Sequence, residues 1–287
     1  MDRSRSGAVV CCSDGRRNRS MEQEKFKKLI HDIELASKMK ITPGQYIFSR
    51  QNSIASAEAK ERADELMSFY KNDSITDIFD ISGGDIANEI LPYLDYNIIR
   101  NSPAVFWGYS DLTTIINAVY SKTGKPSVLY QVRNIEGSFS CVQKKRFSDY
   151  FNGNEQSLFG VKYKMLVGNC MSGVVVGGNI RCFLKLAGTE YFPELQGKLL
   201  LLESLGGGEA RMRTCLSQLK QLGAFEKISG IILGTFTDMQ QKGISPTIEE
   251  LVMNMAENRL PIAKTEEIGH GEDAKAVFIG KELTIQA

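Results

Sequence analysis

The segment Ala104-Val105-Phe106-Trp107-Gly108-Tyr109-Ser110-Asp111-Leu112-Thr113-Thr114-Ile115-Ile116 decides the fold class. Its first residues form an apolar run of the length that is typical of a buried strand, and its last residues continue as an apolar helix. Ser110 therefore lies at a sharp turn from a strand into a helix. Such a turn exposes the serine hydroxyl, and the N–H groups that begin the helix can stabilise a developing oxyanion.

Strands and helices alternate along the chain before this segment. This order predicts an N-terminal α/β domain over residues 1–132, with a parallel sheet that helices cover on both faces. Ligand sites in such a sheet gather at the carboxyl ends of the strands. The predicted elements are strands at Ala8–Cys12 and Asp77–Ile81 and helices at Met21–Lys40, Ala55–Tyr70 and Ala87–Leu94.

The pattern changes after residue 132. Residues 133–163 are polar with scattered aromatic residues, and we interpret them as a linker or lid. Short strands then dominate, which predicts a smaller C-terminal α/β domain over residues 164–287. Its predicted elements are strands at Lys164–Val167, Val174–Val176, Lys198–Leu202 and Gly230–Gly234, a terminal hairpin at Lys275–Gln286, and helices at Met212–Leu222 and Ile248–Asn258.

Composition excludes several classes of function. The 35 Lys and Arg residues almost balance the 34 Asp and Glu residues, so no excess positive charge is available to hold nucleic acid or an anionic membrane. No apolar run approaches the ~20 residues of a membrane span. The six cysteines form no Cys-x-x-Cys pair and only two histidines occur, so we expect no metal site and no cofactor. A small partner and a cytoplasmic location fit best.

Ser110 on its own is more simply explained as a helix cap. The segment also lacks the second glycine of the Gly-x-Ser-x-Gly motif. A serine nucleophile needs a base, and histidine is the usual one. His31 lies in a predicted helix away from its apolar stripe and should be exposed, whereas His270 lies in a glycine-flanked loop that leaves room around the imidazole. An exposed loop histidine is the alternative for His270.

A third member should be a fixed carboxylate that orients the histidine. Glu203 ends the apolar run Leu199–Leu202, where a charge normally needs a partner. Other carboxylates compete for this role and stay open at this point: Asp111, Glu209, Glu272 and Asp273.

Glycines could supply backbone donors near the serine. The N–H of Gly84, which follows a predicted strand, could form an oxyanion hole with the N–H of Asp111. The triple glycine Gly206-Gly207-Gly208 lacks the Gly-Lys-Ser/Thr ending of a phosphate loop, so we interpret it as a flexible helix entry. The segment Gly177-Gly178-Asn179 is most simply a turn, although it could also shape the site.

These residues resemble the LD-carboxypeptidase family of serine peptidases, which also contains the microcin C self-immunity proteins. The resemblance extends over nearly the whole chain, in the type, order and approximate spacing of its motifs. The chain departs from the family at Asp85-Ile86-Ala87-Asn88 and at Tyr130-Gln131-Val132, where substrate contacts can differ. The motifs that carry the resemblance are Val9–Ser13, Gly83-Gly84, Leu91–Tyr96, Gly108–Thr113, Gly177–Asn179, Gly197–Glu203 and Gly269-His270-Gly271.

The resemblance implies a catalytic triad of Ser110, Glu203 and His270, with Gly84 and Asp111 as the oxyanion-hole donors. It also implies a homodimer with the site at the domain junction, and removal without metal of the terminal D-alanine of murein tetrapeptides during cell-wall recycling. Two alternatives remain. One is a self-immunity hydrolase that acts on peptidyl-nucleotide antibiotics, and the other is a peptide-binding protein without catalysis.

Overall fold

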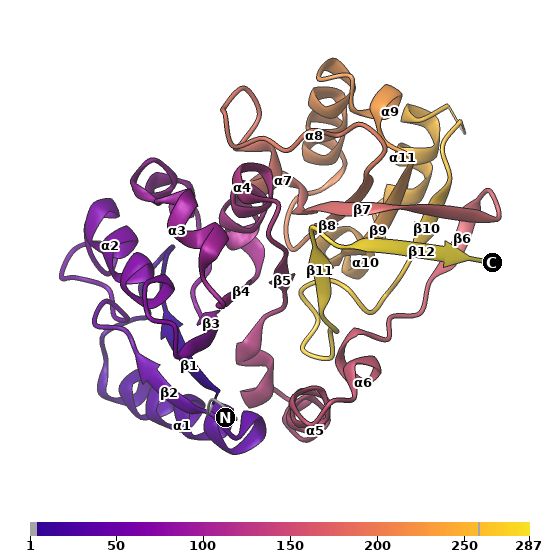
Figure 1. Cartoon of the computed structure of the whole chain (residues 1–287). Helices are drawn as coiled ribbons and strands as arrows, with labels where there is room; N and C mark the ends of the chain where they lie inside the picture. Colours follow the sequence, from indigo (N-terminus) through magenta and orange to yellow (C-terminus); the bar gives the residue numbers. More distant parts are fainter. Residues whose placement is uncertain (1–4, 258) are drawn as a thin grey trace.

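The computed structural model describes residues 5–257 and 259–287, which form two six-stranded sheets, one in each half of Figure 1. The strands of the first sheet are β1 (Ser6–Val10), β2 (Lys40–Pro43), β3 (Ile75–Asp80), β4 (Val105–Gly108), β5 (Ser127–Leu129) and β11 (Val277–Ile279). The strands of the second sheet are β6 (Lys164–Val167), β7 (Cys170–Asn179), β8 (Leu199–Ser204), β9 (Gly230–Phe236), β10 (Ile262–Lys264) and β12 (Glu282–Gln286).

The first sheet has the order β11-β5-β4-β3-β1-β2, and its five strands from the N-terminal half are parallel. The second sheet has the order β12-β7-β8-β9-β10-β6, with parallel β7 to β10 between antiparallel edge strands. Both the predicted α/β class and the parallel N-terminal sheet are therefore confirmed. The carboxyl ends of β3 and β4 and those of β7 and β8 supply the segments described below as the candidate site.

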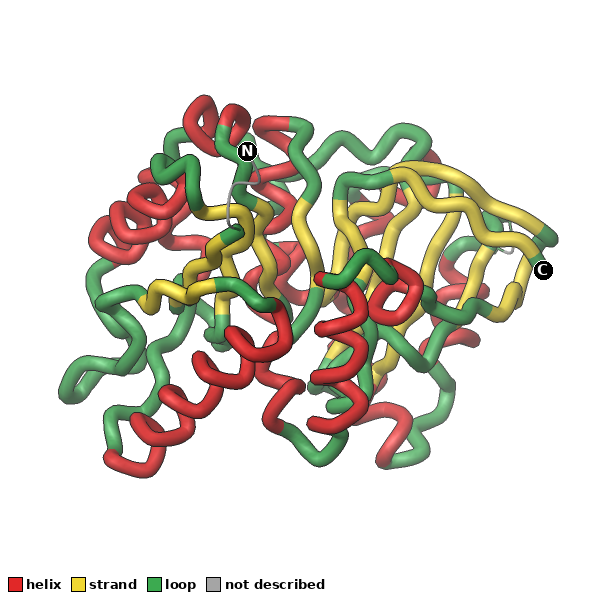
Figure 2. Tube along the Cα trace, turned by 60° about the horizontal axis from the view of Figure 1, so that its bottom comes forward, coloured by secondary structure: helices red, strands yellow, loops and turns green. Residues whose placement is uncertain are grey.

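Helices cover both faces of the first sheet, as Figure 2 shows from another direction. The helices of this half are α1 (Ser20–Ser37), α2 (Ala59–Tyr70), α3 (Tyr96–Asn101), α4 (Thr113–Thr123), α5 (Ser140–Phe151) and α6 (Glu155–Phe159), with 3-10 helices η1 (Ala87–Tyr93), η2 (Ser110–Leu112) and η3 (Val132–Glu136). Successive residues of β1 point to opposite faces, so Val9 packs with α1 and α5 whereas Val10 packs with α2 and α4.

The second sheet is covered on one face by its own helices. They are α7 (Ile180–Leu184), α8 (Glu209–Gln221), α9 (Ala224–Lys227), α10 (Thr237–Gln241) and α11 (Ile248–Met255). Leu200 and Leu202 of β8 face these helices, whereas Leu199 and Leu201 belong to the apolar cluster that contains Ile115 of α4. The alternation along β8 therefore joins the two halves through one continuous core.

Several predicted boundaries differ from the structure. The helix predicted to reach Lys40 ends at Ser37, because Lys38 adopts a left-handed backbone conformation with φ of 58°, and the following residues form β2. The helix predicted from Ala55 begins at Ala59, where Glu58 and Glu61 form a capping box. The predicted helix Ala87–Leu94 is the 3-10 helix η1.

The predicted terminal hairpin at Lys275–Gln286 is wrong. The strand β11 pairs antiparallel with β5 in the first sheet, whereas β12 pairs antiparallel with β7 in the second. Gly280, with φ of 92°, forms the bend between them, and a Cβ there would lie 2.6 Å from the ring of Tyr120. The C-terminal residues therefore connect the two sheets and do not form a local hairpin.

Residues 133–163, which we interpreted as a linker or lid, form η3, α5 and α6. Phe147 and Leu158 are fully buried in the cluster that covers one face of the first sheet, where Phe147 contacts Trp107. Within residues 5–257 and 259–287, no helix combines the length and the apolar character needed to cross a membrane.

Candidate active site

Ser110 is the first residue of η2 and follows β4 at the carboxyl edge of the first sheet. Its backbone adopts a left-handed conformation with φ of 55°, which is uncommon for a residue with a side chain. The predicted sharp turn from strand to helix is therefore present. This conformation carries the hydroxyl out of the sheet and toward the second half of the molecule.

The structure brings Ser110, His270 and Glu203 into one hydrogen-bonded row. His270 Nε2 lies 3.2 Å from Ser110 Oγ, and His270 Nδ1 lies 2.7 Å from Glu203 Oε2. An ionised carboxylate can only accept hydrogen bonds, so Nδ1 carries the ring proton and Nε2 is free to accept the serine proton. The predicted nucleophile, base and orienting carboxylate thus have the contacts that these roles require.

Gly269 allows His270 to reach this position. A Cβ built on Gly269 would lie 1.6 Å from Thr235 Oγ1, so a side chain cannot be accommodated between this loop and the end of β9. His270 itself is largely enclosed, with 8% of its side chain exposed. The ring packs edge-on against Tyr109, with 4.8 Å between ring centroids. The imidazole is therefore held between two fixed neighbours.

Glu203 is fully buried and receives three hydrogen bonds. Besides the contact from His270, the hydroxyl of Tyr109 donates to Oε2 over 3.0 Å and Nδ2 of Asn179 donates to Oε1 over 3.1 Å. Burial and the neighbouring Glu203 carboxylate raise the pKa of Tyr109 well above its usual value, which keeps its hydroxyl a donor. These donors stabilise a charge that has no access to water.

The sequence did not assign Tyr109 to the site, and the segment that contains Asn179 was given only as an alternative that could shape it. Asn179 is the last residue of β7 and aligns with Glu203 on the neighbouring parallel strand β8, so the two side chains meet at one sheet edge. The segment 177–179 that we interpreted as a turn is therefore the end of a strand. The adjacency of Tyr109 to Ser110 was a signal for its place in the site.

The other candidates for the third member are engaged elsewhere. Glu209 pairs with Arg213 over 2.7 Å, Glu272 accepts a hydrogen bond from the backbone of Ser138, and Asp273 is exposed. His31 is exposed on α1, as predicted. Of the carboxylates considered, Glu203 is the one that contacts His270.

Asp111 is also fully buried, but its carboxylate has a different role. It accepts hydrogen bonds from Ser13 Oγ over 2.7 Å, from the backbone N–H of Ala87 over 2.8 Å and from Lys185 Nζ over 2.6 Å. Ser13 follows β1, Ala87 is the first residue of η1 after β3, and Lys185 lies at the C-terminal end of α7. The carboxylate next to the candidate nucleophile therefore connects three separate segments of the chain.

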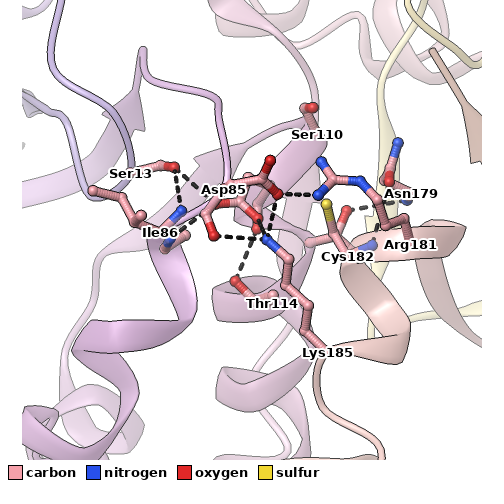
Figure 3. A network of polar contacts seen from close by, with 12 residues as sticks. Ser13, Asp85, Ile86, Ser110, Thr114, Asn179, Arg181, Cys182 and Lys185 are labelled. Carbon is pink, nitrogen blue, oxygen red and sulfur yellow. Dashed lines mark hydrogen bonds and ion pairs between the residues drawn. The ribbon is translucent and has the colours of Figure 1, made fainter. Parts of the chain in front are cut away.

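Asp85 extends this network toward α7. It pairs with Arg181 and with Lys185, whose Nζ lies 2.9 Å from Asp85 Oδ1, and the guanidinium of Arg181 points toward it in Figure 3. Partial burial would raise the pKa of Asp85, but the two cations outweigh burial and lower it. Burial likewise opposes charge on Lys185, yet Asp111 and Asp85 raise its pKa. The ion pairs of Asp85 with Arg181 and Lys185 thus connect the segment after Gly84 to the half of the molecule that contains the second sheet.

A cleft opens on both sides of Ser110. The His270 side is a cavity of about 450 Å³ and the Arg181 side one of about 590 Å³. Ser110 and Gly84 line both cavities. The His270 side is lined by Asp14, Gly15, Arg16, Ile81, Ser82, Gly83, Gly84, Ser110, Gln131, Arg133, Leu205 and His270. The Arg181 side is lined by Gly84, Asp85, Ser110, Asn179, Arg181, Ser204, Leu205, Gly206 and Arg211.

Gly84 has φ of 129°, and a Cβ there would lie 2.1 Å from the carboxyl carbon of Asp14. A glycine is therefore required where the chain passes Ser110 and Asp14. Burial, together with the carboxylates of Asp111 and Asp85, raises the pKa of Asp14. The triple glycine 206–208 precedes α8, in agreement with the predicted helix entry.

Comparisons with known proteins identify the family of the chain. The family model for the LD-carboxypeptidase N-terminal domain matches residues 8–130, and the model for the LD-carboxypeptidase C-terminal domain matches residues 172–285. The chain is 28% identical to the microcin C7 self-immunity protein MccF of Escherichia coli over 276 residues, which cover 84% of this chain and 78% of that protein. It is 24% identical to the murein tetrapeptide carboxypeptidase of Pseudomonas aeruginosa over 258 residues, which cover 85% of this chain and 82% of that protein.

Solved structures share the fold. The microcin C7 self-immunity protein MccF, as an inactive mutant without ligand, matches with a TM-score of 0.85 at 21% identity and covers 99% of this chain and 93% of its own. The muramoyltetrapeptide carboxypeptidase of Oxalobacter formigenes matches with a TM-score of 0.78 at 18% identity, and the match covers 98% of this chain and 95% of that protein. The arrangement of two sheets is therefore common to both kinds of protein.

Proposed function

The chain belongs to the LD-carboxypeptidase family, and on that premise we propose that it is a serine peptidase that removes the terminal D-alanine from murein tetrapeptides. The observation that carries the proposal is the row of hydrogen bonds from Ser110 through His270 to buried Glu203, in a cleft large enough for a peptide. Matches to carboxypeptidases that act on murein peptides support the choice of substrate.

The proposed reaction passes through an acyl-enzyme. His270 Nε2 takes the Ser110 proton as Oγ attacks the scissile carbonyl carbon, and the N–H groups of Gly84 and Asp111 receive the oxyanion. The carbon–nitrogen bond then breaks as His270 returns the proton to the departing amine. Water, with His270 again as base, attacks the ester and releases the acyl product and the free serine. Glu203 remains ionised and stabilises the imidazolium in both halves.

Mass spectrometry of a murein tetrapeptide incubated with the purified protein tests this proposal. We expect the loss of one terminal alanine, and no loss with Ser110→Ala, whose fold is checked by circular dichroism. Near-normal release by Ser110→Ala or His270→Ala would show that the mechanism is wrong. Labelling of Ser110 by an active-serine probe distinguishes an enzyme from a protein that only binds peptides.

The match to the self-immunity protein favours a second candidate function. A solved structure of that protein holds aspartyl sulfamoyl adenosine, and this chain follows its fold with a TM-score of 0.84. The second candidate is hydrolysis of such aminoacyl-nucleotides by the same three residues. One enzyme preparation should be given both substrates, and cleavage of the sulfamoyl adenosine alone would replace our first choice.

A further inference from the structure

Arg133 lines the His270 side of the cleft, and no described residue forms an ion pair with its guanidinium. It lies in η3, the element that follows β5 along the chain, and its Nη2 is 3.9 Å from the position that a Cβ would take on Gly83. Its Nε is buried and forms no hydrogen bond, and no carboxylate of residues 5–257 and 259–287 makes an ion pair with this guanidinium. A largely buried charge of this kind is costly unless something compensates it.

Arg16 adds a second positive charge to the same side. Its Nη2 pairs with Glu22 over 3.1 Å, but its Nε and Nη1 are buried without a hydrogen-bond partner, and 9% of its side chain is exposed. Burial and the positive charge of Arg16 lower the pKa of Arg133, although a guanidinium stays protonated at neutral pH. The carboxylate that lines this cavity, Asp14, accepts a hydrogen bond from the backbone N–H of Asp85. Among the residues that line this cavity, two guanidiniums face this one carboxylate.

The position of His270 indicates which part of a substrate meets these arginines. In the proposed mechanism His270 must protonate the departing amine, so the leaving group lies on the side of the cleft that His270 lines. The Arg181 side does not include His270 among its lining residues. The leaving group of a carboxypeptidase is a single amino acid with a free carboxylate close to that amine. A guanidinium binds a carboxylate through two parallel hydrogen bonds.

We propose that Arg133 binds the terminal carboxylate of the leaving D-amino acid, and that Arg16 behind it strengthens the positive field. The proposal rests on the carboxypeptidase function proposed above and deepens it, because it assigns the residue that restricts cleavage to the end of a peptide. An internal peptide bond presents no carboxylate at this position and leaves the largely buried guanidinium unpaired. The free-energy cost of leaving this guanidinium unpaired makes the protein discriminate against internal peptide bonds.

A binding experiment tests this without turnover. In the Ser110→Ala background, the dissociation constant of a murein tetrapeptide with a free terminal D-alanine is compared with that of the same peptide ending in D-alaninamide. We expect the acid to bind about tenfold to 100-fold more tightly, as hydrogen bonds between charged groups provide. Adding Arg133→Met should reduce this ratio to about one, and adding Arg133→Lys should leave an intermediate ratio.

Arg211 provides the matched control. It lines the Arg181 side of the cleft and is exposed, so Arg211→Met should leave the ratio between acid and amide unchanged. Thermal unfolding adds a readout that separates recognition from structural support. Because Arg133 is unpaired, Arg133→Met should not lower the melting temperature, whereas loss of a structural arginine would lower it.

The outcomes separate this inference from the proposed function. An acid-to-amide ratio that Arg133→Met leaves intact, or no preference for the acid in the Ser110→Ala protein, overturns the role of Arg133. Failure of the protein with intact Ser110 to release D-alanine instead overturns the proposed function, and the binding ratio still decides the inference.

Discussion

Replacing Glu203 by Gln keeps the shape of the side chain and removes its negative charge. The variant therefore tests how much His270 depends on that charge. The amide oxygen can take the place of Oε2 and still accept from His270 and Tyr109. The amide nitrogen then faces Nδ2 of Asn179, and two donors cannot pair. Asn179 can turn its oxygen toward the glutamine only by giving up its hydrogen bond from the N–H of Cys182, which caps α7.

The expected magnitudes follow from this geometry. Loss of the cap or of the Asn179 contact costs about 1 kcal/mol of stability. Loss of the negative charge removes the partner of the imidazolium in a buried site, so kcat/KM for D-alanine release should fall about 10³-fold, equivalent to ~4 kcal/mol. Urea unfolding and initial rates of alanine release measure the two effects. Tyr109→Phe, which keeps the carboxylate and its His270 contact, is the control and should lose less than about tenfold. A Glu203→Gln enzyme within threefold of the wild type would refute the reasoning.

Three further changes test other parts of the structure. Ser110→Gly should be more stable than Ser110→Ala by about 1 kcal/mol in urea unfolding, because both lose the hydroxyl but glycine accepts the positive φ without strain; equal stabilities would contradict this. Phe147→Ala should lower the free energy of unfolding by about 3–5 kcal/mol and leave KM of the folded enzyme unchanged, and a changed KM would instead favour a lid. Asp85→Asn should lower stability at pH 7 by less than about 1 kcal/mol, since the pair is partly exposed. Arg181 and Lys185 lower the pKa of Asp85 in the folded protein. The contribution of the Asp85 carboxylate to stability is therefore present above the usual pKa of 3.8 and is lost as the pH falls through the lower pKa of the folded state. The unfolding curves of the wild type and of Asp85→Asn should therefore converge in acid.

The chemistry of the site could be predicted further than its surroundings. Of the two histidines, only His270 lies in a glycine-flanked loop with room around its ring, so scarcity favoured it over His31. The local pattern left several carboxylates open as its partner, and the family resemblance singled out Glu203. The contacts of Tyr109 and Asn179 with Glu203 depend on strand register and on how the two sheets meet. Neither is a local property of the sequence.

Other differences from the structure have physical causes of the same kind. Residues 133–163 are polar with scattered aromatic residues, and no local pattern indicates that Phe147 of α5 packs against Trp107 on one face of the first sheet. The terminal segment carries strand signals on both sides of Gly280, and two adjacent strands normally pair with each other. Here each strand has a longer-range partner, which periodicity alone does not identify.

The pairing of β11 with β5 also links activity to the course of synthesis. A nascent chain that has emerged only through β5 contains Ser110 but neither Glu203 nor His270, and the edge of its first sheet is still open. The strand that closes this edge follows His270 and is made after most of the second sheet. Pairings between such distant segments form slowly. A product that ends before β8 therefore lacks two of the three residues proposed for the triad, and the proposed activity requires the chain at least as far as His270.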